Sequence, residues 1–182
     1  MDEAGCGPWA GPVVAAAVIL RRHRLLVRVD DSKRLTPLQR ERAYGAILEH
    51  AEVGFGVADA AEIDLHNILQ ARLLAMQRAL GDLPAAAELV LVDGTAAPAV
   101  EAACWAIVDG DRRSYVIGCA SIMAKVARDR MMRFYHRLAP RYGFHRHKGY
   151  GTPLHIARLK RHGPCLFHRH TFRPVYEALR AV

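Results

Sequence analysis

Apolar residues in the first half of the chain fall into short runs that are separated by turn residues. The run Val13–Leu20 is unbroken and follows a Gly-Pro pair, so we predict a buried strand there. Residues 52–58 place Val, Phe and Val at alternate positions, which is typical of a half-buried strand. Residues 88–94 and 104–111 are two further apolar runs, and both lead into Asp-Gly. We expect both to be strands.

Helical periodicity and capping residues predict helices between these strands. Thr36, Pro37 and Gln39 have the pattern of a capping box with proline at the first helical position, so we expect a helix to begin there. Asp59 and Glu62 form a second such pair at the start of a longer helix. Apolar residues then recur at helical spacing and predict one buried stripe. The stripe consists of Leu65, Leu69, Leu73, Met76 and Leu80.

The second half of the chain is dominated by helical patterns. A helix of about twenty residues is expected to run through residues 121–138. Residues 140–152 are basic, aromatic and punctuated by glycine, so we expect a loop. Thr152 and Gly163 are the capping and stop residues of a short helix, and residues 172–179 suggest a last one. The order of elements predicts an α/β fold with a helical C-terminal part.

The charge balance favours a polyanionic partner. Lysine and arginine number 26 against 18 acidic residues, which gives a formal charge of +8 and a pI near 9.7. Such a charge attracts nucleic acid, and arginine, which outnumbers lysine here, matches phosphate geometry well. Solubility alone, or a genome-wide preference for arginine, would explain the same balance.

The cysteines and the hydropathy favour a reducing compartment without membrane contact. None of the four cysteines forms a Cys-x-x-Cys pair, so we expect neither a zinc site nor a disulfide framework. Acidic rather than basic residues follow Met1, and the run Val13–Leu20 is too short to span a bilayer. We therefore expect a cytoplasmic protein.

Four acidic residues occur where predicted strands begin or end. Asp2 and Glu3 precede the first long strand, Asp93 ends one strand, and Asp111 follows another. Carboxylates that meet at strand ends need cations to offset their charge, and such oxygen ligands select Mg²⁺ or Mn²⁺. A pair of these ions suits phosphodiester hydrolysis. Each acid alone has a structural alternative, namely turn formation, helix capping or a solvated terminus.

Several ordered stretches then point to one family. They read "DEAGCGPWAGPVVAAAVIL", "DSKRLT", "IDLHNILQARLLAMQRAL", "LVDG", "GDRRSYVIGCASIMAKVARDR" and "HKGYGTPLHIARLKRHGPCLFHRHTFRPV". Together they resemble type 2 ribonucleases H (ribonuclease HII) along nearly the whole chain. The resemblance implies a ribonuclease H-like mixed β-sheet flanked by helices. It also implies a single catalytic domain over residues 1–182, with a core in 1–139 and a basic, substrate-binding helical region in 140–182.

The resemblance further implies an activity. Members are endonucleases with a two-metal site for Mn²⁺ or Mg²⁺ that cut the RNA strand of RNA·DNA hybrids. They also cut on the 5′ side of a ribonucleotide embedded in duplex DNA, and the products carry a 3′-hydroxyl and a 5′-phosphate. We therefore expect RNA·DNA hybrids and ribonucleotide-containing DNA duplexes as partners, and a monomeric enzyme.

Site residues can be carried over by motif. The resemblance makes Asp2, Glu3, Asp93 and Asp111 the catalytic metal ligands. It makes Gly5, Cys6 and Gly7 the loop that reads the 2′-hydroxyl, and Tyr150 the ring that packs on the sugar at the RNA–DNA junction. The expected phosphate-binding residues are Lys33, Ser121, Lys125 and Lys148. For His145, His147, His168 and His170 we expect proximity to phosphate or solvent.

Three features depart from the family pattern. Cys6 stands where members usually carry arginine or lysine, which predicts substrate binding weaker by about 1.5–3 kcal/mol. Met1 alone precedes the acidic pair, so most of the expected first strand is missing. Asp109 is an extra carboxylate beside Asp111, and we expect it to face away from the metals.

Two other interpretations remain open. The alternative to an active nuclease is a catalytically impaired hybrid-binding protein, because of Cys6 and the truncated first strand. A hydrolase of small phosphate esters is disfavoured by the long basic tail around Tyr150.

Overall fold

The computed structural model describes residues 1–21, 24–30, 32 and 34–180, and its strands form a mixed arrangement. Strand β1 (Asp2–Ala4) pairs antiparallel with β2 (Val13–Leu20), and β2 pairs antiparallel with β3 (Ala51–Ala58). Strands β4 (Leu89–Asp93) and β5 (Ala103–Ile107) pair in parallel.

Met1 joins these two groups of strands. Its ammonium group donates a hydrogen bond to the carbonyl oxygen of Leu91 at 2.6 Å, and its own carbonyl oxygen accepts one from the Asp93 N–H at 3.1 Å. Burial lowers the pKa of this ammonium group to about 6. The end of β4, which carries Asp93, is thereby fixed next to β1, which carries Asp2 and Glu3.

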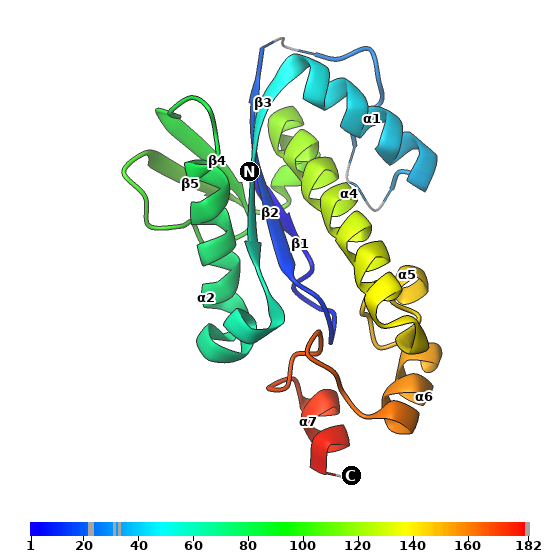
Figure 1. Cartoon of the computed structure of the whole chain (residues 1–182). Coiled ribbons are helices and arrows are strands. Elements are labelled where there is room, and N and C mark those ends of the chain that lie inside the picture. Colours follow the sequence, from blue (N-terminus) through cyan, green and yellow to red (C-terminus); the bar gives the residue numbers. More distant parts are fainter. Residues whose placement is uncertain (22–23, 31, 33, 181–182) are drawn as a thin grey trace.

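Helices cover both faces of the strands (Figure 1). Helix α2 lies on one face, whereas α1 and α4 lie on the other, and the short helices α5, α6 and α7 gather at one end of α4. None of the helices in the described part of the chain is long and apolar enough to cross a membrane. The helices are α1 (Pro37–His50), α2 (Ala60–Gly81), α3 (Gly110–Arg113), α4 (Tyr115–Leu138), the 3-10 helix η1 (Pro140–Tyr142), α5 (Phe144–His147), α6 (Pro153–His162) and α7 (Arg173–Arg180).

The predicted capping residues are confirmed. The Thr36 side chain accepts a hydrogen bond from Gln39 N–H, and the Gln39 side chain accepts one from Thr36 N–H, which completes the capping box of α1. Asp59 and Glu62 do the same for α2. These exchanges satisfy N–H groups that have no partner within the first helical turn.

Strand β3 is half-buried, as the alternating pattern predicted, but its two sides are covered to different degrees. Val53, Phe55 and Val57 are only half-buried, whereas Gly54 and Gly56 on the other side of the strand are buried. A Cβ atom on Gly56 would lie 1.9 Å from the carbonyl oxygen of Ala75 in α2. The backbone of α2 therefore packs directly on β3, and the two glycines make this approach possible.

The predicted burial of the leucine stripe of α2 is wrong for the first half of the stripe. Leu65 and Leu69 are 76% and 48% exposed, while Met76 is fully buried among alanines. Asn67, whose φ of 64° interrupts the helix, separates Leu65 from the rest of the predicted stripe. Its side-chain oxygen accepts hydrogen bonds from the N–H groups of Leu69 and Gln70, and so caps the second part of the helix.

The segment expected to be a loop, residues 140–152, contains η1 and α5. Their three and four residues are shorter than the windows in which periodicity can be recognised. The preceding helix, α4, begins at Tyr115, six residues before the apolar pattern indicated. The C-terminal helix α6 keeps its predicted cap Thr152 and its predicted stop Gly163.

The close packing of α2 on β3 predicts opposite effects for two glycines. Gly56→Ala should lower the free energy of unfolding by more than about 2 kcal/mol, because its methyl group would overlap the α2 backbone. Gly45→Ala should raise it by roughly 0.5–1 kcal/mol, since Gly45 lies within α1 with open space around it. Urea denaturation measures both. Similar changes for the two variants would contradict the packing described here.

Candidate active site

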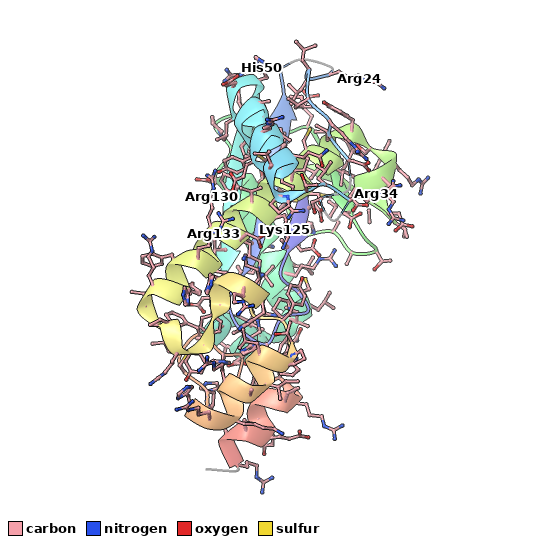
Figure 2. The ribbon with its side chains drawn as sticks, turned by 90° about the vertical axis from the view of Figure 1, so that its right-hand side faces the viewer. Arg24, Arg34, His50, Lys125, Arg130 and Arg133 are labelled. Carbon is pink, nitrogen blue, oxygen red and sulfur yellow. The ribbon has the colours of Figure 1, made fainter. Side chains whose placement is uncertain are left out.

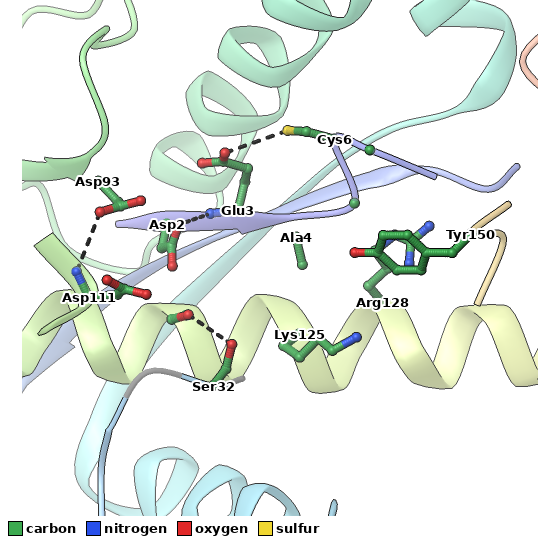
Figure 3. Close-up of a pocket in the computed structure, with 13 residues that line it drawn as sticks. Asp2, Glu3, Ala4, Cys6, Ser32, Asp93, Asp111, Lys125, Arg128 and Tyr150 are labelled. Carbon is green, nitrogen blue, oxygen red and sulfur yellow. Dashed lines mark hydrogen bonds between the residues drawn. The ribbon is translucent and has the colours of Figure 1, made fainter. Parts of the chain in front are cut away.

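A cavity of about 330 Å³ opens between β1, the end of β4, α3 and α4 (Figure 3). It contains all four predicted acids, the predicted glycine loop, and three of the residues expected to contact substrate. It is lined by Asp2, Glu3, Ala4, Gly5, Cys6, Gly7, Ser32, Asp93, Asp111, Ser121, Lys125, Arg128 and Tyr150. The structure thus brings together residues that lie up to 148 positions apart, from Asp2 to Tyr150.

The acids are brought together by backbone hydrogen bonds. Asp2 and Glu3 are consecutive in β1, and the Glu3 N–H donates to Asp2 Oδ1 at 2.7 Å. Asp93 Oδ1 accepts hydrogen bonds from the N–H groups of Gly110 at 2.7 Å and Asp111 at 3.4 Å. The start of α3 is therefore attached to the end of β4, and Asp111 faces the same cavity as Asp93.

Burial and crowding of like charges affect these carboxylates. Asp2 is 5% exposed, and burial together with the adjacent Glu3 raises its pKa to about 7. Burial also raises the pKa of Glu3, although the guanidinium group of Arg72 opposes that shift. Arg72 Nε lies 3.3 Å from Glu3 Oε1, and Arg72 also donates to the carbonyl oxygen of Asp93 at 3.1 Å.

The donor set fits a divalent cation. Four carboxylates line one cavity, and Glu3 Oε2 is buried there without a hydrogen-bond partner in the described residues. No three His, Cys, Asp or Glu side chains in the part of the chain that the structure describes are already arranged to hold an ion. Glu3 is held by Arg72, and Asp93 by the α3 backbone. Hard oxygen ligands and concentrated negative charge are nevertheless what Mg²⁺ and Mn²⁺ require.

Two buried arginines hold the glycine loop through hydrogen bonds to its backbone carbonyl oxygens. Arg169 donates to the carbonyl oxygens of Gly5 at 2.6 Å, Cys6 at 2.9 Å and Gly11 at 2.8 Å. Arg128 donates from Nε to the carbonyl oxygen of Pro12 at 2.9 Å. Gly5 has a φ of 104°, and a Cβ atom there would lie 2.1 Å from Arg128 Nε, so glycine is required.

Cys6 acts as a hydrogen-bond donor to the acidic pair. Its thiol lies 3.5 Å from Glu3 Oε1, which is the oxygen that also faces Arg72. Burial and the nearby Glu3 raise the pKa of this thiol to about 12, so it stays protonated at neutral pH. Glu3 therefore has a neutral donor from the loop and a cationic neighbour from α2.

Helix α4 presents one face to the cavity. Ser121 and Lys125 lie one turn apart, as the sequence predicted, and both line the cavity. Ser121 donates to the Ser32 hydroxyl at 3.1 Å, and Lys125 pairs with Asp129 at 2.9 Å. Sequence analysis missed Arg128, although its distance of seven residues from Ser121 places it on the same face.

Among the predicted substrate residues that the structure describes, Lys148 does not line the cavity, and the predicted Lys33 lies outside the described residues. Lys148 has a left-handed backbone with φ 53° at the end of α5, and its side chain donates to the carbonyl oxygen of His145. Burial, together with nearby Arg133, Lys125 and Arg128, lowers the pKa of Lys148. Its charge is therefore close to the basic end of the cavity.

The expectation that His147 and His168 face phosphate or solvent is wrong. They are 6% and 1% exposed, and they lie with the fully buried His155 behind Tyr150. Basic neighbours in the sequence concealed this burial, because α5, α6 and the segment before α7 fold over the rings. His155 Nε2 and His168 Nε2 are 3.1 Å apart.

The extra acid of the sequence, Asp109, is separated from the cavity. It is exposed, has a left-handed backbone with φ 53°, and precedes the first residue of α3. Asp111 lies in the first turn of α3 and lines the cavity. The two acids are therefore distinguished by geometry despite their proximity in sequence.

Comparison with known sequences gives one consistent result. A family model described as Ribonuclease HII matches residues 1–175. Ribonuclease HII of Chloroflexus aggregans is 49% identical over 185 residues, which covers 98% of this chain and 87% of the relative. Ribonuclease HII 1 of Methylibium petroleiphilum is 51% identical over 181 residues, which covers 98% of this chain and 91% of the relative.

Comparison with solved structures supports the same fold. Ribonuclease H2 from Pyrococcus horikoshii OT3 is similar with a TM-score of 0.81 at 24% identity, over 99% of this chain and 95% of that chain. Bst-RNase HIII in complex with Mn²⁺ has a TM-score of 0.77 at 19% identity, over 99% of this chain and 68% of that one. At these identities the likeness concerns the fold alone. It confirms the predicted mixed sheet with flanking helices.

The buried histidines predict a stability that falls in acid. Burial lowers the pKa of His155 to about 4 and that of His168 to about 3, from an ordinary value of 6.5. Below about pH 6.5 these histidines become protonated in the unfolded chain but stay neutral in the folded chain. The free energy of unfolding should therefore fall by about 1.4 kcal/mol per pH unit for each histidine. The fall should end near the folded pKa values. Chemical denaturation between pH 7.5 and 4 measures it.

Matched variants isolate this effect from the carboxylates. His168→Asn should flatten the pH dependence, whereas His66→Asn, at an exposed position, should leave it unchanged. An unchanged slope in His168→Asn would show that this histidine does not cause the acid sensitivity.

The arginine beneath the glycine loop predicts a large loss of stability on truncation. Arg169→Met keeps a long side chain but leaves the carbonyl groups of Gly5, Cys6 and Gly11 without their donor. We expect the free energy of unfolding to fall by at least about 3 kcal/mol. Arg173→Met is the control, since that side chain is 89% exposed and should change stability by less than about 0.5 kcal/mol. Equal effects in denaturation curves would argue against the role of Arg169.

Proposed function

Because the chain belongs to the ribonuclease HII family and is therefore a metal-dependent endoribonuclease, we propose that it hydrolyses the RNA strand of RNA·DNA hybrids and cuts 5′ to ribonucleotides embedded in duplex DNA. The products would carry a 3′-hydroxyl and a 5′-phosphate. The observation that supports this most strongly is the cavity in which four carboxylates, a glycine loop and an exposed aromatic ring lie together.

The acidic end of the cavity is the proposed site of hydrolysis. Asp2, Glu3, Asp93 and Asp111 would hold two Mn²⁺ or Mg²⁺ ions there. Such ions activate water and stabilise the leaving oxygen in phosphodiester hydrolysis. Glu3 Oε2 is buried and has no hydrogen-bond partner among the described residues, and burial beside Glu3 raises the pKa of Asp2. Both observations support this assignment, since a bound divalent cation would offset the crowded negative charge.

The glycine loop and Tyr150 are the proposed means of telling RNA from DNA. Discrimination at one nucleotide requires contact with the 2′-hydroxyl, which both donates and accepts hydrogen bonds. With the carbonyl groups of Gly5 and Cys6 held by Arg169, the loop has a fixed shape from which its remaining groups would meet the sugar. Tyr150 is 46% exposed and lies beside Gly7, where its ring would pack on the neighbouring sugar.

A basic surface beside the cavity would bind the duplex backbone. Figure 2 shows Lys125, Arg130 and Arg133 along α4. It also shows Arg24 and Arg34, which belong to the segment between β2 and α1. Arg130 and Arg133 share one acid, since their guanidinium nitrogens lie 2.6 and 3.7 Å from the carboxylate of Glu41. These three side chains together therefore carry excess positive charge. Phosphate contacts of this kind position a duplex without reading its sequence.

Cleavage of a DNA duplex that contains one ribonucleotide tests the proposal. We expect cleavage with Mn²⁺ or Mg²⁺ and none without a divalent ion. Asp93→Asn and Asp111→Asn should each reduce kcat by more than about 100-fold, because even changes behind metal ligands cost about 10–100-fold. Asp109→Asn is the matched control and should retain the activity of the parent protein, since Asp109 is exposed and outside the cavity.

One result would overturn the proposed activity, and another would overturn the assignment of Asp111. Retained hybrid binding without cleavage under either ion would indicate the catalytically impaired binding protein instead. A larger loss of activity for Asp109→Asn than for Asp111→Asn would exchange the roles of the two acids.

A further inference from the structure

Three buried histidines lie directly behind the segment that carries Tyr150. His147 ends α5, His155 lies in α6, and His168 lies before α7. They are 6%, 0% and 1% exposed, and the rings of His147 and His155 stack with centroids 4.3 Å apart. None of them lines the cavity, so the acidic site accounts for none of them.

Backbone hydrogen bonds fix where each proton sits on two of these rings. The N–H of Cys165 donates to His168 Nδ1 at 3.0 Å, so a neutral His168 must carry its proton on Nε2. That atom faces His155 Nε2 at 3.1 Å, which must therefore accept. The proton of His155 then lies on Nδ1, 3.0 Å from the carbonyl oxygen of Tyr150. A directed chain thus leads from Cys165 through both rings to Tyr150.

The third histidine holds the residue before Tyr150. The N–H of Gly149 donates to His147 Nδ1 at 3.1 Å, so the proton of His147 lies on Nε2 and is donated to the carbonyl oxygen of Tyr142 at 2.9 Å. The carbonyl oxygen of Gly149 accepts a hydrogen bond from the Trp9 N–H at 2.8 Å. The Tyr150 segment is therefore attached to the loop that contains Trp9 as well as to the histidines.

The low pKa values of these rings agree with neutral tautomers. Burial lowers the pKa of His147, and lowers those of His155 and His168 to about 4 and 3. A metal-binding role for the cluster is not indicated, because each ring nitrogen already has a hydrogen-bond partner. The network is thus complete in itself and ends at the backbone of Tyr150.

We propose that His155, oriented by His168, is a positioning residue that sets the Tyr150 ring for its contact with the sugar at the RNA–DNA junction. This inference rests on the role proposed for Tyr150 above. The ring itself is half-exposed, so its place over the cavity follows from its backbone, and His155 holds that backbone through the Tyr150 carbonyl oxygen. A change at His155 should therefore affect selection of the junction more than hydrolysis itself.

Two substitutions separate the halves of the imidazole ring. In His155→Asn the side-chain amide nitrogen can take the place of Nδ1 and still donate to Tyr150. In His155→Gln the amide oxygen can take the place of Nε2 and accept from His168, but the donor to Tyr150 is lost. KM and kcat are measured on a duplex with one embedded ribonucleotide and on an all-RNA·DNA hybrid, with Tyr150→Ala as reference.

We expect His155→Gln to raise KM for the single-ribonucleotide duplex about tenfold, the usual size for the loss of one buried hydrogen bond, with kcat on the hybrid little changed. His155→Asn should stay within about twofold of the parent protein. An equal rise in KM for both variants, or a rise that follows their loss in melting temperature, would show that His155 has only a structural role and would overturn the inference. No loss in either would overturn it too.

Two further measurements keep the outcomes distinct. If Tyr150→Ala leaves the preference for the junction unchanged, the role proposed for Tyr150 fails, whatever His155 does. Nitrogen-15 NMR of the unmodified protein reports the tautomers directly. We expect the proton of His155 on Nδ1 and that of His168 on Nε2, and the reverse assignment would overturn the inference even if the variants do not fold.

Discussion

The guanidinium group of Arg169 holds the candidate site together. It is fully buried and donates to the carbonyl oxygens of three loop residues, Gly5, Cys6 and Gly11. Arg128 lies close to it and donates to two further carbonyl oxygens, those of Pro12 and Ala10. Burial and the nearby Arg128 lower the pKa of Arg169 to about 9. Neither arginine forms an ion pair with a carboxylate among the described residues, and buried cations of this kind are costly, so the loop must keep its shape for its carbonyl oxygens to accept their hydrogen bonds.

These arginines also contribute to a separation of charge along the cavity. Figure 3 shows Asp2, Glu3, Asp93 and Asp111 toward one end, and Lys125 and Arg128 toward the other, near Tyr150. Arg128 Nη1 is buried without a hydrogen-bond partner in the described residues, so the positive charge at this end is not fully offset by hydrogen bonds. Under the proposed function, one phosphate of the substrate strand would lie among these cations, while its neighbour would meet the divalent ions held by the carboxylates.

The loss of a cation at Cys6 has a different meaning in the structure than in the sequence. The sequence predicted only a weaker contact with phosphate. In the folded chain Cys6 donates to Glu3 beside Arg72, so a guanidinium group lies close to the loop position at which the resemblance leads us to expect a cation. Arg72 acts from α2 and is not among the residues that line the cavity, and its contacts at the site are with the Glu3 carboxylate and the Asp93 carbonyl oxygen.

Local chemistry explains which features could be predicted. Capping boxes at Thr36 and Asp59, and the arrival of Asp93 and Asp111 at neighbouring strand ends, depend on residues close in sequence and on general sheet geometry. The interruption of α2 could not be predicted, because it depends on the positive φ of one residue, Asn67. The burial of His168 and the hydrogen bonds from Arg169 to the glycine loop could not be predicted either, since both depend on contacts between the two ends of the chain. Periodicity carries no information about such contacts.

The distance between those ends has a consequence for the order of events during synthesis. Gly5 and Arg169 are 164 residues apart, whereas the hairpin of β1 and β2 needs only neighbouring residues. Contacts that close long loops form late, and a chain leaving the ribosome folds from its N-terminal part first. The strand that carries Asp2 and Glu3 can therefore assemble early, while the loop beside it waits for residue 169. A nascent chain can therefore pair β1 with β2 before it contains the arginine that holds the neighbouring glycine loop in shape.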